Sequence, residues 1–156
     1  MTVGPAIVFD PQLDLELKRE VAVPPRLVWR AWTEPALLMQ WFTPVPWRTT
    51  ACEIDLRPGG AWRFVWRRDD GSEMEMSGVY KEIAPPERLV STEAWGGDWP
   101  ETLNTLLLTE QGGQTTIKQW VRYPSRAARD AALQTGMEDG VEESYNRLER
   151  LVSSMV

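Results

Sequence analysis

The feature that most constrains the fold of this chain is a series of short strand-like segments followed by one long helical pattern. Apolar and polar residues alternate in several of these segments, which indicates half-buried β-strands. Strands are predicted at residues 13–21, 49–56, 61–68, 72–83, 88–95, 102–109 and 115–123. Turn residues such as Asp69-Asp70-Gly71 separate consecutive strands, so we expect an antiparallel meander.

Helical patterns flank the meander. Pro24 and Pro25 end the first strand, and apolar residues at helical spacing predict two short helices between Pro25 and Phe42. Ser125 is predicted to cap a further short helix. An apolar stripe then repeats at steps of three and four residues, at Met137, Val141, Tyr145, Leu148, Val152 and Met155. Thr135 and Glu138 have capping-box spacing at the start of this last helix.

These patterns predict one α+β domain. Residues 1–11, which include Gly4, Pro5 and Pro11, are expected to form a flexible lead-in. Residues 12–156 contain no linker or repeat, and their length suits a single domain. The long C-terminal helix is expected to cover the apolar face of the sheet.

Composition excludes several classes of function. The net charge of −6 argues against nucleic acid and anionic membranes as partners, because both attract basic surfaces. No segment approaches the ~18 apolar residues of a membrane span, so a cytoplasmic location is expected. The chain has no histidine, and its single cysteine, Cys52, is expected to be a buried small hydrophobe. No metal and no cofactor are therefore predicted, and binding is favoured over catalysis.

Nine tryptophans in 156 residues indicate a large internal surface or a concave aromatic pocket. One face of a predicted hairpin carries Trp62, Phe64, Trp66, Met74 and Met76. This face is either the wall of an apolar cavity or solid core. We place Trp95 and Trp120 at the mouth, and Trp99 is either a mobile gate or an anchor for its loop.

Carboxylates offer few candidates for catalysis. Glu73 and Glu75 alternate with the methionines, so we expect both to face solvent. Glu93 shares strand parity with Trp95, so it either points inward, with a raised pKa, or lies exposed at a strand edge. The hydroxyl of Tyr145 either reaches the cavity or belongs to the core.

Several ordered motifs resemble a known superfamily. They are residues 23–35 followed by Trp41-Phe42, residues 55–62, residues 78–89 and residues 136–140. Together they resemble the SRPBCC (START-like, Bet v 1-like) superfamily, and more narrowly the domain named for the activator of the heat-shock-protein-90 ATPase. The resemblance implies a helix-grip fold, in which a curved antiparallel sheet wraps a long C-terminal helix around an internal cavity.

The resemblance also guides the choice of site residues. The predicted cavity wall comprises Trp41, Trp62, Phe64, Trp66, Met74, Met76, Glu93, Trp95, Trp120, Met137, Val141 and Tyr145. The family often has Trp where this chain has Val141, which suggests a larger cavity unless an aromatic side chain from the sheet fills the space.

The resemblance implies binding of a small hydrophobic molecule, such as a lipid, sterol, polyketide or aromatic compound, without catalysis. Two alternatives stay open: a chaperone-associated protein partner, and a cyclase-like or hydratase-like enzyme acting on an aromatic or polyketide substrate. Homodimers are common in the superfamily, so a homodimer is also an option.

Overall fold

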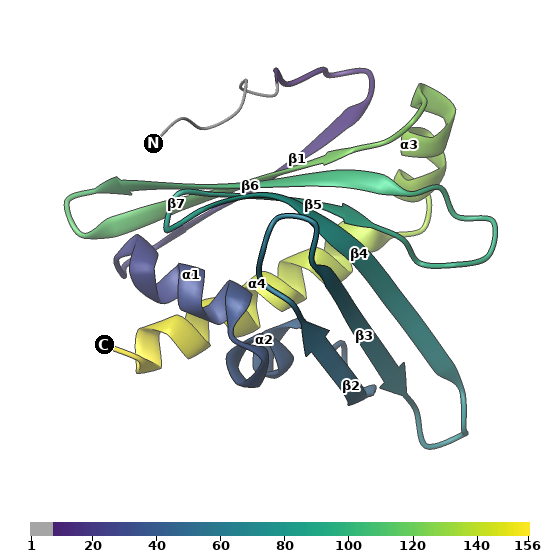
Figure 1. Cartoon of the computed structure of the whole chain (residues 1–156), viewed down its shortest axis with the longest axis horizontal. Coiled ribbons are helices and arrows are strands. Elements are labelled where there is room, and N and C mark those ends of the chain that lie inside the picture. The colour runs from purple at the N-terminus through teal and green to yellow at the C-terminus, as the bar shows by residue number, and fades with distance from the viewer. Residues whose placement is uncertain (1–7) are drawn as a thin grey trace.

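The fold, seen here in a computed structural model that describes residues 8–156, is built on a seven-stranded antiparallel sheet. Its spatial order is β1-β7-β6-β5-β4-β3-β2. The strands are β1 (Asp14–Val21), β2 (Arg48–Ile54), β3 (Ala61–Arg67), β4 (Glu73–Ala84), β5 (Arg88–Glu93), β6 (Thr102–Gln111) and β7 (Gln114–Arg122). Figure 1 shows that β2, β3 and β4 turn steeply away from the other strands, which curves the sheet around one face.

Helices lie on the concave side of this sheet. They are α1 (Pro25–Thr33), α2 (Pro35–Phe42), α3 (Arg126–Leu133) and α4 (Met137–Ser154). Figure 1 shows α4 running across the concave face with α1 and α2 beside it, while α3 sits at one end. The predicted α+β helix-grip architecture is thus confirmed, with two short helices after the first strand and a long helix at the C-terminus.

The main core lies between α4 and the sheet. Tyr145, Leu148 and Val152 of the predicted helical stripe are buried there against aromatic residues of the sheet and of α1 and α2. The indole of Trp41 is also buried, and its Nε1 donates a hydrogen bond to the carbonyl of Ala31 at 2.8 Å. Trp41 therefore fixes α2 against α1.

Of the two N-terminal caps predicted for α3 and α4, the structure confirms the first and contradicts the second. Ser125 caps α3 as predicted, because its hydroxyl accepts a hydrogen bond from the Ala128 amide at 3.1 Å. The capping box predicted for α4 is wrong: Gly136 is the N-cap, with φ of 77°, and Thr135 donates to the Ala132 carbonyl instead. The tight turn between α3 and α4 needs a left-handed residue, so the glycine takes the capping position.

The N-terminal side of β1 is fixed to the sheet by a buried ion pair. Asp14 is 1% exposed and accepts two hydrogen bonds at 2.8 Å from the Arg122 guanidinium. Arg122 also donates to the carbonyl of Val8, which holds the end of the predicted lead-in near the sheet. Residues 1–7 of that predicted lead-in lie outside the described residues. Within residues 8–156, no helix has both the length and the apolar composition needed to cross a bilayer.

Candidate functional site

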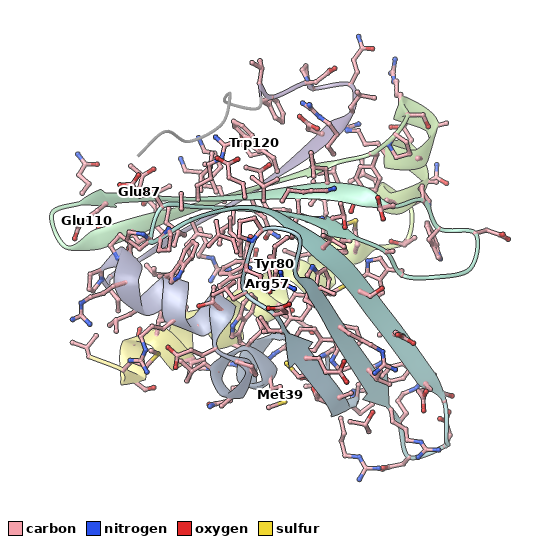
Figure 2. All side chains as sticks on the ribbon, viewed as in Figure 1. Met39, Arg57, Tyr80, Glu87, Glu110 and Trp120 are labelled. Carbon is pink, nitrogen blue, oxygen red and sulfur yellow. The ribbon has the colours of Figure 1, made fainter. Side chains whose placement is uncertain are left out.

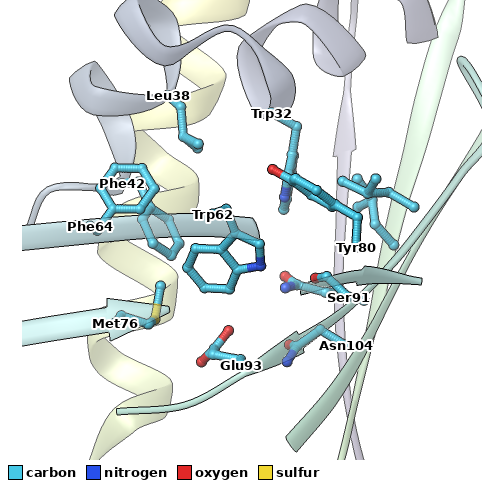
Figure 3. Close-up of a pocket in the computed structure, with 13 residues that line it drawn as sticks. Trp32, Leu38, Phe42, Trp62, Phe64, Met76, Tyr80, Ser91, Glu93 and Asn104 are labelled. Carbon is cyan, nitrogen blue, oxygen red and sulfur yellow. The ribbon is translucent and has the colours of Figure 1, made fainter. Parts of the chain in front are cut away.

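A small cavity lies between the concave face of the sheet and the helices (Figure 3). Its lining residues are Trp32, Leu38, Phe42, Trp62, Phe64, Met76, Tyr80, Leu89, Ser91, Glu93, Asn104, Leu106 and Gln119. Its volume is about 70 Å³. That is less than half of the ~150 Å³ known to hold benzene in an engineered protein cavity, so the empty pocket is narrow.

Aromatic side chains form one wall of the cavity. Trp62 and Phe64 come from β3 and lie 6.3 Å apart, centroid to centroid. Phe42 of α2 packs against Phe64 at 5.3 Å. In the β3–β4 register Phe64 lies opposite Met76, which adds a flexible thioether to the same wall. This wall confirms that the inward face of the predicted hairpin is apolar.

Polar side chains gather on the facing strands. Ser91 and Glu93 project from β5 on the same face, and Asn104 lies opposite Ser91 on β6. The Asn104 amide donates to the Thr102 hydroxyl at 3.0 Å. Gln119 of β7 accepts a hydrogen bond from the Tyr145 hydroxyl at 2.6 Å. The cavity therefore has an aromatic side and a polar side.

Glu93 is the one carboxylate among the lining residues. Figure 3 shows its carboxylate pointing into the cavity toward Trp62 and Met76. The Trp95 indole donates to its Oε1 at 2.7 Å. Burial raises the pKa of Glu93, and the hydrogen bond from Trp95 opposes this only in part. Burial, together with the charge of Glu93, also raises the pKa of Tyr123 to about 12.

The position of Trp62 depends on a glycine. Gly78 of β4 lies opposite Trp62 in the register, and a Cβ at this position would be 2.6 Å from Trp62 Nε1. The indole thus packs directly on the strand backbone. Its Nε1 is buried without a hydrogen-bond partner among residues 8–156, although a buried donor normally finds one.

Other reactive groups do not form a second site in the described part of the chain. There, no three His, Cys, Asp or Glu side chains lie close enough together to hold a metal ion. Cys52 is half-buried against the core, and burial and Glu53 raise its pKa. A raised pKa disfavours the thiolate, which is the nucleophilic form.

Comparison with known proteins identifies the family. A sequence model described as Activator of Hsp90 ATPase homolog 1-like protein matches residues 22–153. The chain belongs to this family. A crystal structure of a Nitrosomonas europaea protein is 32% identical with a TM-score of 0.84, and the match covers 94% of this chain and 98% of that one. No curated protein matches the chain.

Two further solved structures are similar to this chain. A crystal structure of a Rhodobacter sphaeroides protein is 32% identical with a TM-score of 0.86, over 99% of both chains. A crystal structure of a Mycobacterium smegmatis protein shares the fold, with 23% identity, a TM-score of 0.80 and 90% coverage of each chain.

The predicted wall residues of this Activator of Hsp90 ATPase homolog 1-like chain are only partly brought together. Trp62, Phe64, Met76 and Glu93 line the cavity. The surrounding core contains Trp41, Trp66, Met74, Val141 and Tyr145. Val141 is partly buried against this core and does not line the cavity of about 70 Å³.

Three predicted wall residues lie elsewhere. Trp95 is 40% exposed and stacks on Trp66 at 5.8 Å, so it covers the rim beside Glu93. Met137 packs in a second cluster with Tyr123. Trp120 lies on the side of the sheet opposite the helices (Figure 2), where its indole donates to Glu16 at 2.8 Å.

Several lining residues were missed by the sequence analysis. Gln119 is the neighbour of Trp120, and strand alternation places only one of the two inside. The pattern Thr115, Ile117, Gln119 was the available signal, because Thr115 and Ile117 are both buried. Trp32 reaches the cavity from α1, and nothing in its helical spacing predicts which strands it faces.

Proposed function

We propose that this chain binds a small, largely apolar molecule in the cavity between the sheet and the helices, without catalysing a reaction. The observation that carries the proposal is the division of the cavity into an aromatic wall and a cluster of polar side chains on β5, β6 and β7. Ligand sites typically combine apolar walls with a few placed polar groups that fix orientation.

The cavity volume sets the size of the ligand. About 70 Å³ is below the ~300–1,000 Å³ of typical drug-sized sites, so a sterol enters only if wall side chains move. A short branched chain or a single ring needs a smaller adjustment. Met76 is the flexible element of the wall, and Trp95 covers the rim without being buried. The structure therefore favours small ligands over long lipids.

Native mass spectrometry of freshly purified protein, beside the same sample denatured, tests the proposal. We expect a small-molecule mass that is retained only under native conditions, or quenching of tryptophan fluorescence by members of a panel of small aromatic and branched aliphatic compounds. A clean apo mass with no response to the panel would refute the proposal. That result would favour binding to a protein partner instead. The family's description names such a role, activation of the Hsp90 ATPase.

Two serines allow a matched control. Ser91 faces the cavity, whereas Ser77 lies opposite Arg63 on the outward face of the sheet. Ser91→Leu should fill much of the cavity and abolish binding, while Ser77→Leu should bind as the wild type does. Equal binding by all three proteins would place the ligand elsewhere.

A second candidate function is an enzyme acting on an aromatic or polyketide substrate. Glu93 favours it, because a carboxyl group with a raised pKa inside a cavity is suited to general acid–base work. Incubation of the retained compound with the protein distinguishes the candidates. Formation of a product that is lost in Glu93→Gln supports the enzyme, and unchanged compound supports the binding protein.

A further inference from the structure

The charged side chains that line the cavity are of one sign, negative. Glu93 contributes the one carboxylate, and no Lys or Arg is found among the described residues that line the cavity. Glu93 also takes part in no ion pair within residues 8–156, although twelve ion pairs are formed there. The protein therefore places a half-buried acidic group beside an aromatic wall without a basic partner, which is less favourable than a paired charge there.

The hydrogen bonds of Glu93 leave one acceptor available. Trp95 Nε1 donates a hydrogen bond to Oε1 of Glu93, whereas Oε2 of Glu93 has no hydrogen-bond partner within residues 8–156. Asn104 uses its amide nitrogen to bind Thr102, which leaves its carbonyl oxygen free of side-chain partners there. Ser91, opposite Asn104, adds a hydroxyl on the same face. The polar side of the cavity thus offers several acceptors, and an ammonium group supplies three donors.

The aromatic wall suits the same kind of group. Trp62 and Phe64 lie across the cavity from the polar strands (Figure 3), and the faces of aromatic rings carry negative potential. A cation near such faces gains roughly 0.5–2 kcal/mol, and tryptophan is the most favourable ring. A carboxylate ligand would instead meet Glu93 and the ring faces together, and both repel it.

We infer that the ligand of this cavity carries an ammonium group on a small apolar body, with the ammonium bound to Glu93 and the apolar part against Trp62 and Phe64. This inference rests on the proposed function and specifies the chemical class of the ligand. The site would reject the matching carboxylate, and would bind the matching alcohol weakly because it leaves the charge of Glu93 unpaired.

Three probes with a branched four-carbon skeleton test the inference: isobutylamine, isobutanol and isobutyrate. Binding is measured by isothermal titration of the full chain near neutral pH, with tryptophan fluorescence as a second readout. We expect the amine to bind about 10- to 100-fold more tightly than the alcohol, as hydrogen bonds to charged groups usually provide. We expect no binding of the carboxylate.

Two matched variants locate the effect. Glu93→Gln should lower the affinity for isobutylamine to that for isobutanol, because the charge-assisted contact is removed. The affinity of the variant for isobutanol should stay within about threefold of the wild-type value. Glu75→Gln removes a carboxylate that pairs with Arg63 on the outward face, and it should bind all three probes as the wild type does. Circular dichroism establishes that both variants are folded.

The outcomes separate the two proposals. Equal binding of the amine and the alcohol by the wild type would overturn the inference and leave the proposed function standing, and this comparison needs no variant. Amine binding that survives Glu93→Gln would also overturn it. Failure of every probe, together with failure of the broader panel, would overturn the proposed function itself.

Discussion

Gly78→Ala is expected to be strongly destabilising because the added methyl group has no room. A Cβ at Gly78 would lie 1.9 Å from the Thr92 carbonyl oxygen and 2.6 Å from Trp62 Nε1. The Thr92 oxygen belongs to the backbone, so it cannot move aside without shifting β5 against β4. Overpacking typically lowers the free energy of unfolding by about 1–3 kcal/mol. Because the clash at Gly78 is with backbone, which cannot rotate away, we expect a loss at or above the upper limit of this range. We therefore expect a loss of about 3 kcal/mol in the free energy of unfolding.

Gly140→Ala is the matched control, because it is the same substitution in open space. Gly140 lies exposed in α4, and nothing approaches within 4 Å of its added Cβ. Alanine is favoured over glycine in helices by roughly 0.5–1 kcal/mol, so this variant should be more stable than the wild type. The two variants should thus change stability in opposite directions.

Urea and thermal unfolding followed by circular dichroism measure both effects without relying on tryptophan emission. A chain of this size shifts its Tm by about 2–4 °C per kcal/mol, so Gly78→Ala should lower Tm by about 6–12 °C. Gly140→Ala should raise it by up to about 4 °C. A Gly78→Ala protein within about 0.5 kcal/mol of the wild type would refute the close packing of Trp62 on β4.

Two further substitutions test the buried polar contacts. Asp14→Asn should cost about 1–3 kcal/mol at pH 7 in urea unfolding, because it weakens the pair with Arg122. Burial opposes ionisation of Asp14, but hydrogen bonds from Arg122 and the Asp10 amide lower its pKa overall, so its contribution is present above the unfolded pKa and is lost as the pH falls through the folded one. Acid unfolding that is identical in Asp14→Asn and the wild type would contradict this. Tyr145→Phe should cost about 1 kcal/mol in thermal unfolding through loss of the bond to Gln119, and an unchanged Tm would argue against that bond.

The sequence was sufficient to predict the architecture and one wall of the site. Alternation in β3 and β4 placed Trp62, Phe64 and Met76 on one face, because strand geometry fixes which side chains share a side. In β7 the prediction was wrong by one residue, and neighbouring residues of a strand face opposite sides of the sheet. Trp120 was predicted at the mouth of the cavity, but the strand turns its indole outward to Glu16.

Other features of the site depend on packing between distant elements. Trp32, Leu38 and Phe42 line the cavity because α1 and α2 lie over the curved sheet, and helical periodicity does not specify which strands a helix covers. The volume of the cavity follows from the fit of all these side chains together. For Glu93 the sequence left an inward and an exposed position open and favoured the exposed one, whereas in the structure Glu93 lies opposite Thr102 and lines the cavity.

The stability of the empty protein provides an independent test of the environment of Glu93. Burial raises its folded pKa above the unfolded value of ~4.3, so the folded state holds the proton more tightly than the unfolded state. Stability contributed by the neutral form is therefore present at low pH and is lost as the pH rises through the folded pKa. Trp95 donates to the carboxylate, and Tyr123, with a pKa of about 12, stays neutral across this range.

Glu93→Gln keeps the shape of the neutral acid and removes the titration. The variant should resemble the wild type in stability near pH 4 and become more stable than it as the pH rises toward 8, in urea unfolding at matched ionic strength. An excess of isobutylamine should narrow this difference at pH 8, since it stabilises only the protein that retains the carboxylate. A stability difference that does not change with pH would mean that Glu93 is solvated, and the reasoning that assigns it a cationic ligand would fail with it.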